Sequence, residues 1–145
     1  MNDMFLTINM ELQYTHPFGK LSPYFDGLAS GRAMASRCGI CGWVWFPPHI
    51  TCPEDGGKCE WLELDGNGEV ISLTKTRSII PFTEKYIDHI FVMVAVAGAN
   101  NVTFGRVISS ENVTSLGDKV RLVESTRGNT HLPHTATFEL LKGHE

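Results

Sequence analysis

Apolar and polar side chains alternate at the start of the chain. Met4, Leu6, Ile8, Met10 and Leu12 occupy every second position, which is the period of a β-strand with one buried face. The pattern predicts an N-terminal strand or extended arm. Its apolar face must be buried, so the arm either pairs as an extra strand or lies across a partner protein.

The next segment carries the start and stop signals of a short helix. Ser22 stands at the N-cap position and Pro23 at the first helical position, and Gly31 marks the end. The expected apolar face is formed by Phe25, Leu28 and Ala29. We therefore expect a helix that leads directly into the next unit.

The second half of the chain reads as β-structure. After a turn signal at 65–68, five segments have strand character: 69–78, 90–99, 102–109, 116–125 and 135–142. Residues 78–89 are expected to be the long connection between the first two strands. Gly105 is expected to mark a bulge or a tight bend. Five short strands in about eighty residues predict a small closed barrel.

All four cysteines lie between positions 38 and 59. Cys38 and Cys41 are separated by two residues, which lets two thiolates of one turn reach a single Zn²⁺. Cys52 follows after ten residues, but six residues then precede Cys59, where a regular second knuckle would have two. Asp55 stands at the regular position and is the alternative ligand. We predict a zinc ion held by the four cysteines.

The alternative reading of the cysteines is that they form disulfides or are buried as small apolar residues. No secretory signal opens the sequence, so we expect a reducing cytoplasmic location, where disulfides are rare. The longest apolar run, 90–97, is far shorter than the ~20 residues of a membrane-spanning helix. Four protein thiolates would leave the ion no open position, and this favours structural zinc over catalytic zinc.

Length and charge limit the remaining functions. The chain has 145 residues and a formal net charge of −4, enough for one core with a small appendage. We expect an arm and helix over 1–32, a zinc ribbon over 33–64 and a barrel over 65–145. The part from residue 66 onward has eight basic and eight acidic residues, so its attraction to a nucleic-acid polyanion is weak.

The order of these parts resembles a bacterial and archaeal family that combines a rubredoxin-like zinc ribbon with an OB-fold. The resemblance spans about residues 20–141 and rests on the segments PYFDGL, RCGICGWVWFPP, GNGEVISLT and SLGDKVRL. It implies a mainly β fold with a five-stranded OB-fold barrel. The second knuckle and the longer N-terminal arm depart from the family pattern.

The same resemblance implies a function. Members of the family accompany thiolase-like or ketoacyl-synthase-like catalytic subunits, which handle acyl-CoA or acyl-phenol substrates. For this chain it implies a non-catalytic scaffold subunit in a hetero-oligomer. The expected reaction, carried out by the partners, is acetyl transfer between acylphloroglucinols in antibiotic biosynthesis.

No catalytic centre is expected in the chain itself. The four cysteines are committed to the metal, and His131 and His134 form the only close histidine pair, without a third ligand nearby. Glu111, Asp118 and Glu124 read as solvated positions. The aromatic side chains after the first knuckle, Trp43, Trp45 and Phe46, either pack onto the barrel or serve as anchors for a partner.

Two other functions are carried as alternatives. An OB-fold can bind nucleic acid, and its surface can also serve as a docking module for coenzyme A or an acyl carrier. Both would use a local basic patch, for which the candidates are Lys75, Arg77, Arg106, Arg121 and Arg127. The same residues can also serve only to keep the protein surface soluble.

Overall fold

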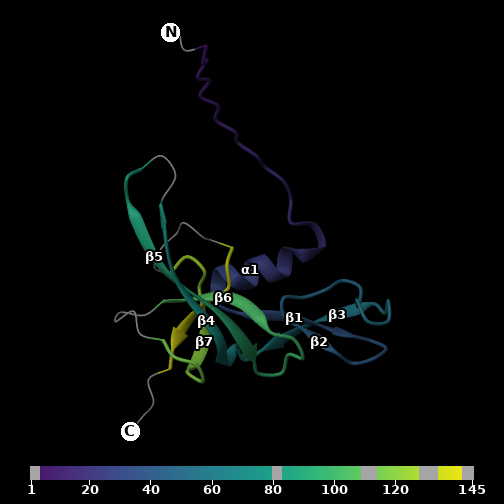
Figure 1. Ribbon diagram of the computed structural model, residues 1–145. Coiled ribbons are helices and arrows are strands. Elements are labelled where there is room, and N and C mark those ends of the chain that lie inside the picture. The colour runs from purple at the N-terminus through teal and green to yellow at the C-terminus, as the bar shows by residue number, and fades with distance from the viewer. Residues whose placement is uncertain (1–3, 80–82, 109–113, 128–133, 142–145) are drawn as a thin grey trace.

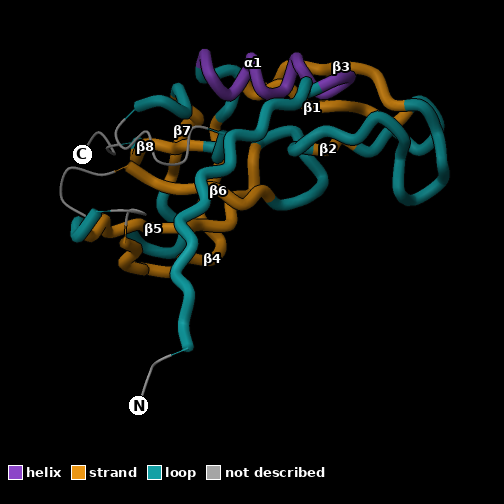
Figure 2. Tube along the Cα trace, turned by 90° about the horizontal axis from the view of Figure 1, so that it is seen from above, coloured by secondary structure: helices purple, strands orange, loops and turns teal. Residues whose placement is uncertain are grey.

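The computed structural model describes residues 4–79, 83–108, 114–127 and 134–141. It contains a three-stranded sheet, a closed five-stranded barrel and one α-helix, joined to an extended N-terminal arm (Figure 1). Viewed from above, the helix lies along the side of the three-stranded sheet, and the barrel lies at the end of that sheet (Figure 2). The mainly β fold expected from the sequence is confirmed.

The arm, residues 4–18, has no regular secondary structure and forms no strand pairing. Figure 1 shows it running away from the barrel and from the three-stranded sheet. A single 3₁₀ turn, η1 (Gly19–Leu21), joins it to the helix. The arm is therefore the extended segment that the alternating pattern allowed, and its apolar side chains have no cover within the described chain.

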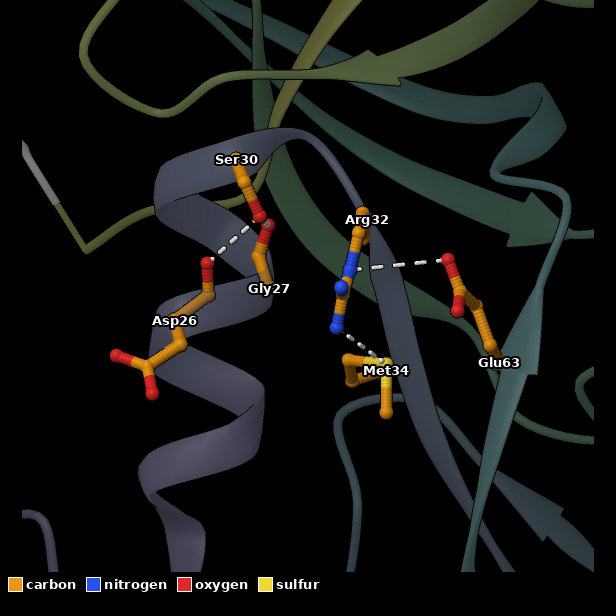
Figure 3. A network of polar contacts seen from close by, with 6 residues as sticks. All are labelled: Asp26, Gly27, Ser30, Arg32, Met34 and Glu63. Atoms are coloured by element: carbon orange, nitrogen blue, oxygen red, sulfur yellow. Dashed lines mark hydrogen bonds and ion pairs between the residues drawn. The ribbon is translucent and has the colours of Figure 1, made fainter.

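The helix α1 (Ser22–Ser30) ends where the sequence predicts. Gly31 adopts a left-handed φ of 72°, which glycine tolerates best. The Ser30 hydroxyl donates to the Asp26 carbonyl at 2.9 Å, and Arg32, just after the turn, forms an ion pair with Glu63 at 3.7 Å (Figure 3). The helix end is thereby fixed against the strand that carries Glu63.

Two details of the predicted helix are wrong. Ser22 is the first helical residue and not the N-cap; its hydroxyl donates to the Gly19 carbonyl at 2.7 Å, because the 3₁₀ turn continues directly into the helix. Leu28 is buried as expected, but Ala29 is exposed. The buried face instead includes Gly27, where a Cβ atom would lie 2.7 Å from the Arg32 carbonyl oxygen.

The three-stranded sheet, here called the ribbon, is antiparallel with the strand order β2-β1-β3. Its strands are β1 (Ala33–Cys38), β2 (Val44–Trp45) and β3 (Cys59–Leu64). A loop between β2 and β3 carries an isolated bridge between Thr51 and Lys58. Cys38 ends β1 and Cys59 begins β3, whereas Cys41 lies in the turn between β1 and β2 and Cys52 in the loop between β2 and β3.

The barrel closes in the order β4-β5-β6-β8-β7. Its strands are β4 (Asn67–Ile79), β5 (Tyr86–Val96), β6 (Thr103–Ile108), β7 (Lys119–Val123) and β8 (Thr137–Leu140). The pair β6–β8 is parallel and the other four pairs are antiparallel. This is a five-stranded Greek-key barrel of the OB type.

Part of the predicted connection over 78–89 is strand: residues 78–79 belong to β4 and residues 86–89 to β5. Arg77 lies opposite Asp88 and Ile79 opposite Tyr86, so β4 and β5 continue as a hairpin beyond the barrel. The pairing there is supported by an exposed ion pair between Arg77 and Asp88 at 2.6 Å. Because this part of the hairpin covers no core, its sequence lacks the apolar alternation that marks a strand.

Of the two expectations for Gly105, a bulge or a tight bend, the bulge is not found. Pairing of β6 with β5 is regular through Gly105, and the irregularity lies in β4 between Val70 and Ser72. A Cβ atom at position 105 would lie 2.7 Å from the Phe138 ring. The glycine therefore makes room for a core side chain of β8.

The ribbon and the barrel share one core. Ala33, Ala35, Val44 and Phe46 of the ribbon pack with the buried side chains of the barrel. The loop between β5 and β6 also binds the edge of β2: Asn100 exchanges two hydrogen bonds with Val44, both of 2.8 Å. The proposed boundaries at 32 and 64 thus fall within a continuously packed molecule.

No helix in the described ranges is long and apolar enough to span a membrane.

Candidate metal centre

The first knuckle forms where β1 ends. The Cys38 carbonyl accepts a hydrogen bond from the Gly42 N–H at 3.1 Å, and the Cys38 N–H donates to the Trp43 carbonyl at 2.9 Å. Gly42 has a φ of 73°, a conformation that glycine adopts without strain. This tight turn brings Cys41 back beside Cys38.

The second knuckle repeats the first, residue for residue. The Cys52 carbonyl accepts from the Gly56 N–H at 2.9 Å, and the Cys52 N–H donates to the Gly57 carbonyl at 2.8 Å. Gly56 also has a φ of 73°. In this repeat Asp55 takes the position that Cys41 has in the first knuckle, so the second knuckle is regular once Asp55 is counted.

The two knuckles bring four donor atoms together. One donor atom from each of Cys38, Cys41, Cys52 and Asp55 lies within 4.8 Å of the others. The Sγ atoms of Cys41 and Cys52 are 3.7 Å apart, and the Cys38 Sγ lies 3.3 and 3.6 Å from the two carboxylate oxygens of Asp55. Zn–S bonds of about 2.3 Å give a tetrahedral edge of about 3.8 Å. The group can therefore hold a tetrahedral metal ion.

Backbone donors favour the thiolate of Cys38. Burial raises the pKa of this thiol, but hydrogen bonds from the backbone N–H groups of Cys41 and Ile40 outweigh burial and leave the pKa below its usual value. The Ile40 nitrogen lies 3.3 Å from the sulfur. A thiolate is the form of cysteine that binds metal.

Cys41 lies among other acidic donors. The Trp43 N–H lowers the pKa of its thiol, but burial and the neighbouring Asp55, Cys38 and Cys52 together raise this pKa to about 12. Among the described residues, Asp55 forms no ion pair with a lysine or arginine. A metal ion among the four donors would remove this mutual repulsion, because it supplies the missing positive charge.

Because Gly57 has no side chain, it leaves room for two of the metal donors. A Cβ atom at this position would lie 2.8 Å from the Cys38 Sγ and 2.9 Å from the Asp55 Oδ1. The Gly57 N–H donates to the same Oδ1 at 2.8 Å, and this bond is the main reason why the pKa of Asp55 lies below its usual value. The position of Gly57, two residues after Asp55, is the signal in the sequence for this contact.

Cys59 lies near the four donors Cys38, Cys41, Cys52 and Asp55 but is not one of this compact group. It starts β3 directly opposite Cys38 and is buried. Burial raises the pKa of the Cys59 thiol, and the nearby Cys38 and Cys52 raise it further. The four-cysteine set predicted from the sequence thus differs at one position from the group of donors that the structure brings together.

The three aromatic residues after the first knuckle have different surroundings. Phe46 is fully buried in the shared core, and Trp45 is buried beside Cys38, Cys52 and Cys59. Trp43 is 41% exposed and its ring lies 5.3 Å from that of Trp45. A role in partner binding stays a prediction, and of these three side chains only Trp43 is exposed.

The five basic candidates do not gather into a free patch. Arg77 pairs with Asp88, and both Arg121 and Arg127 pair with Glu139, at 2.7 and 2.8 Å. Arg106 is buried and donates to the Thr137 hydroxyl at 3.0 Å and to the Ser125 carbonyl at 2.8 Å. Four of the five cations are therefore already engaged within the chain.

The predicted histidine pair lies partly outside the described residues, which include His134 but not His131 or Glu111. The His134 ring makes edge contacts with Phe18 and Phe25, with centroids 5.2 and 5.7 Å apart. It joins the start of the helix to the end of the arm, and this contact is a packing role. The absence of a catalytic centre stays a prediction.

No family model matches the chain. In sequence it is similar to a DUF35 domain-containing scaffold protein of Methanothermobacter thermautotrophicus, with 29% identity over 90 residues, which are 61% of this chain and 68% of that protein.

Two solved structures share the fold. One is a DUF35 family protein of unknown function from Sulfolobus solfataricus, with a TM-score of 0.59 and 16% identity over 85% of this chain and 87% of that one. The other is the Ltp2-ChsH2(DUF35) aldolase, with a TM-score of 0.62 and 18% identity over 88% of this chain and 98% of that one. The chain is thus similar in sequence to a DUF35 domain-containing protein and shares its fold with two solved structures whose descriptions include DUF35.

Proposed function

We propose that the chain is a non-catalytic, zinc-binding scaffold subunit of a multi-subunit acyltransferase. The observation that carries the proposal is the arm, a long apolar segment whose side chains are exposed among the described residues. Met4, Phe5, Leu6, Ile8, Met10, Leu12 and Tyr14 are between 68% and 95% exposed. An exposed apolar surface of this extent marks an interaction site.

The form of the arm indicates how it docks. Its backbone is extended and unpaired, so its N–H and C=O groups can form a ladder with the edge strand of another protein. Leu6, Ile8 and Met10 would then enter apolar pockets on one side, while Thr7 and Asn9 face the other side. A segment of this kind binds by strand addition to a partner that has a free sheet edge.

The zinc ion has a structural role in this proposal. Its ligands are Cys38, Cys41 and Cys52 with Asp55 in place of Cys59, because the second knuckle repeats the first with Asp55 at the ligand position. When bound, the ion supplies a positive charge that ties the two knuckles together. A set of four protein ligands leaves no position for a substrate.

The partners are thiolase-like or ketoacyl-synthase-like catalytic subunits, and the reaction is acetyl transfer between acylphloroglucinols. The support is threefold: the family resemblance of the sequence, the similarity to a DUF35 scaffold protein, and the fold shared with an aldolase that contains a DUF35 chain. The bond-forming chemistry takes place in the partner subunits. A cytoplasmic location and the segments 1–32, 33–64 and 65–145 belong to the same proposal.

Binding of nucleic acid or coenzyme A phosphates is less well supported. Either ligand needs free cations on one surface. Arg77, Arg121 and Arg127 are held by carboxylates, and Arg106 is buried against Thr137. Among the five candidates, only Lys75 lacks an observed ion pair or buried hydrogen bond, and one lysine is not a phosphate site.

The test is a reconstitution. The chain is tagged and purified from its native cells, and the co-purifying subunits are identified by mass spectrometry. Acetyl transfer from monoacetylphloroglucinol is then measured with the chain alone, with the partners alone and with the complex. We expect thiolase-like partners and activity only in the complex, and we expect deletion of residues 4–16 to prevent assembly. Transfer by the chain alone would contradict the proposal.

A further inference from the structure

Cys59 faces Cys38 across the ribbon. The two residues are directly opposite in the antiparallel pairing of β1 with β3. The next pair outward is hydrogen-bonded, since the Gly39 N–H donates to the Lys58 carbonyl at 3.0 Å, whereas the N–H groups of Cys38 and Cys59 donate elsewhere. Cys38 and Cys59 are thus a non-hydrogen-bonded pair, in which Cα atoms lie about 4.5 Å apart with adjacent side chains.

This position suits a disulfide. Disulfides join residues whose Cα atoms are about 4.4–6.8 Å apart. Cys38 and Cys59 are 2% and 8% exposed and belong to one small buried cluster, and both thiols are free. The compact group of metal donors does not include Cys59, so its thiol is available for another reaction.

We propose that Cys38 and Cys59 form a reversible disulfide when the protein meets hydrogen peroxide, and that this bond withdraws Cys38 from the metal site and releases the ion. The inference rests on the ligand set proposed above, in which Cys59 is not a ligand. It adds a site of oxidative modification to a subunit whose proposed role is assembly.

The reaction balances with peroxide as the oxidant. The Cys38 sulfur attacks one peroxide oxygen, so that an S–O bond forms, the O–O bond breaks and water leaves after protonation. The Cys59 thiolate then attacks the sulfenic sulfur of Cys38, the S–O bond breaks and a second water leaves. Two thiols and one peroxide thus give one disulfide and two waters.

Cys38 is only 2% exposed but borders an open depression, which is the route that we propose for peroxide. This depression in the surface of the ribbon is lined by Cys38 together with Arg37, Ile40, Cys41 and Glu60. The ion leaves because the sulfur of Cys38 is no longer a thiolate, and a disulfide sulfur is a poor metal ligand. A thiol reductant restores both cysteines and the site.

The experiment uses the full zinc-loaded chain without partners, so that its result is independent of the scaffold role. Zinc released by peroxide is followed with a chromogenic chelator, and tryptic peptides are mapped by mass spectrometry without reduction. Cleavage after Arg37 and Lys58 places Cys59 on a different peptide from the other three cysteines. We expect a link between these two peptides, with fragmentation assigning it to Cys38, and its loss after dithiothreitol.

A Cys59→Ser variant serves as the comparison. We expect it to bind one zinc ion per chain when reduced and to lack the link between the two peptides after peroxide. Two outcomes would overturn the inference. One is peroxide-driven zinc loss with Cys59 unmodified; the other is a reduced Cys59→Ser protein that binds no zinc, which would make Cys59 a ligand.

Discussion

At the scale of single residues, Gly57 is the most restrictive position in the metal centre. Its missing side chain leaves room for the Cys38 sulfur and the Asp55 carboxylate, which lie 2.8 and 2.9 Å from where a Cβ atom would stand. Both are donors, so a methyl group would separate the atoms that share the ion. Gly39 is in a similar loop, but a Cβ atom there would meet only the Lys58 carbonyl at 3.4 Å.

A Gly57→Ala variant should therefore lose about tenfold or more in zinc affinity, the range seen when groups that orient metal ligands are disturbed. Competition with a chromogenic chelator measures this change. Gly39→Ala is the matched control and should bind zinc nearly as the natural chain does. Equal affinity of the two variants would mean that the donors are not held as the structure places them.

The fourth ligand can be identified with a pair of variants. Asp55→Ala removes a donor from the compact group and should lower zinc affinity by at least tenfold, whereas Cys59→Ala removes a side chain outside it and should leave the stoichiometry at one ion per chain. Cobalt substitution gives a second readout, because the intensity of the thiolate-to-metal bands reports the number of sulfur ligands. Bands of a four-sulfur site, lost in Cys59→Ala, would favour the four-cysteine set.

The sequence predicted most of this centre because the ligand positions are local. Two residues separate Cys38 from Cys41 and also Cys52 from Asp55, so one turn determines each pair. The regular spacing pointed to Asp55, but the sequence did not decide against Cys59, because a loop of six residues can also turn back to the ion. The choice depends on the turn that the Gly56 N–H closes on the Cys52 carbonyl.

At the scale of elements, the loop between β5 and β6 joins the ribbon to the barrel. Asn101 binds both backbone groups of Phe46: its side-chain oxygen accepts from the Phe46 N–H at 2.9 Å and its amide donates to the Phe46 carbonyl at 3.0 Å. The Thr103 hydroxyl donates to the same carbonyl. The edge of β2 is therefore satisfied by side chains of the barrel and not by another strand.

An Asn101→Ala variant should lower the free energy of unfolding by about 1–3 kcal/mol, because the Phe46 N–H loses its acceptor in a partly buried site. Urea titration followed by circular dichroism measures the change. Asn9→Ala, in the exposed arm, is the control and should have almost no effect. A similar loss of unfolding free energy in both variants, or no loss in either, would contradict the role of Asn101 in joining the ribbon to the barrel.

The bounds of helices and strands were predictable where they depend on a short local stretch of sequence. Gly31 ends the helix as expected, because a left-handed residue is a local requirement. The continuation of β4 and β5 to Ile79 and Tyr86 was not predictable, since it depends on pairing across strands with no apolar face to indicate it. The hydrogen bonds of Asn101 with Phe46 join residues 55 positions apart, and no local sequence pattern predicts them.

At the scale of the whole molecule, an exposed arm extends from a body with one packed core. The barrel and ribbon share one core, whereas the apolar side chains of the arm face outward. The arm is anchored at its base, where the Phe18 ring stacks on Phe25 with centroids 4.1 Å apart. A fixed base and a free apolar strand suit a subunit that attaches to another protein, which is the central claim of the proposed function.

Hydrogen exchange of the amides in residues 4–16 tests this claim most directly. Within the described part of the chain these amides have no backbone partners, so in the isolated chain they should exchange at the rate of an unfolded peptide. In the complex with its catalytic partners, a strand-added arm should protect about every second amide, because alternate N–H groups point toward the partner's edge. Arm amides that exchange equally fast in the isolated chain and in the active complex would contradict the account.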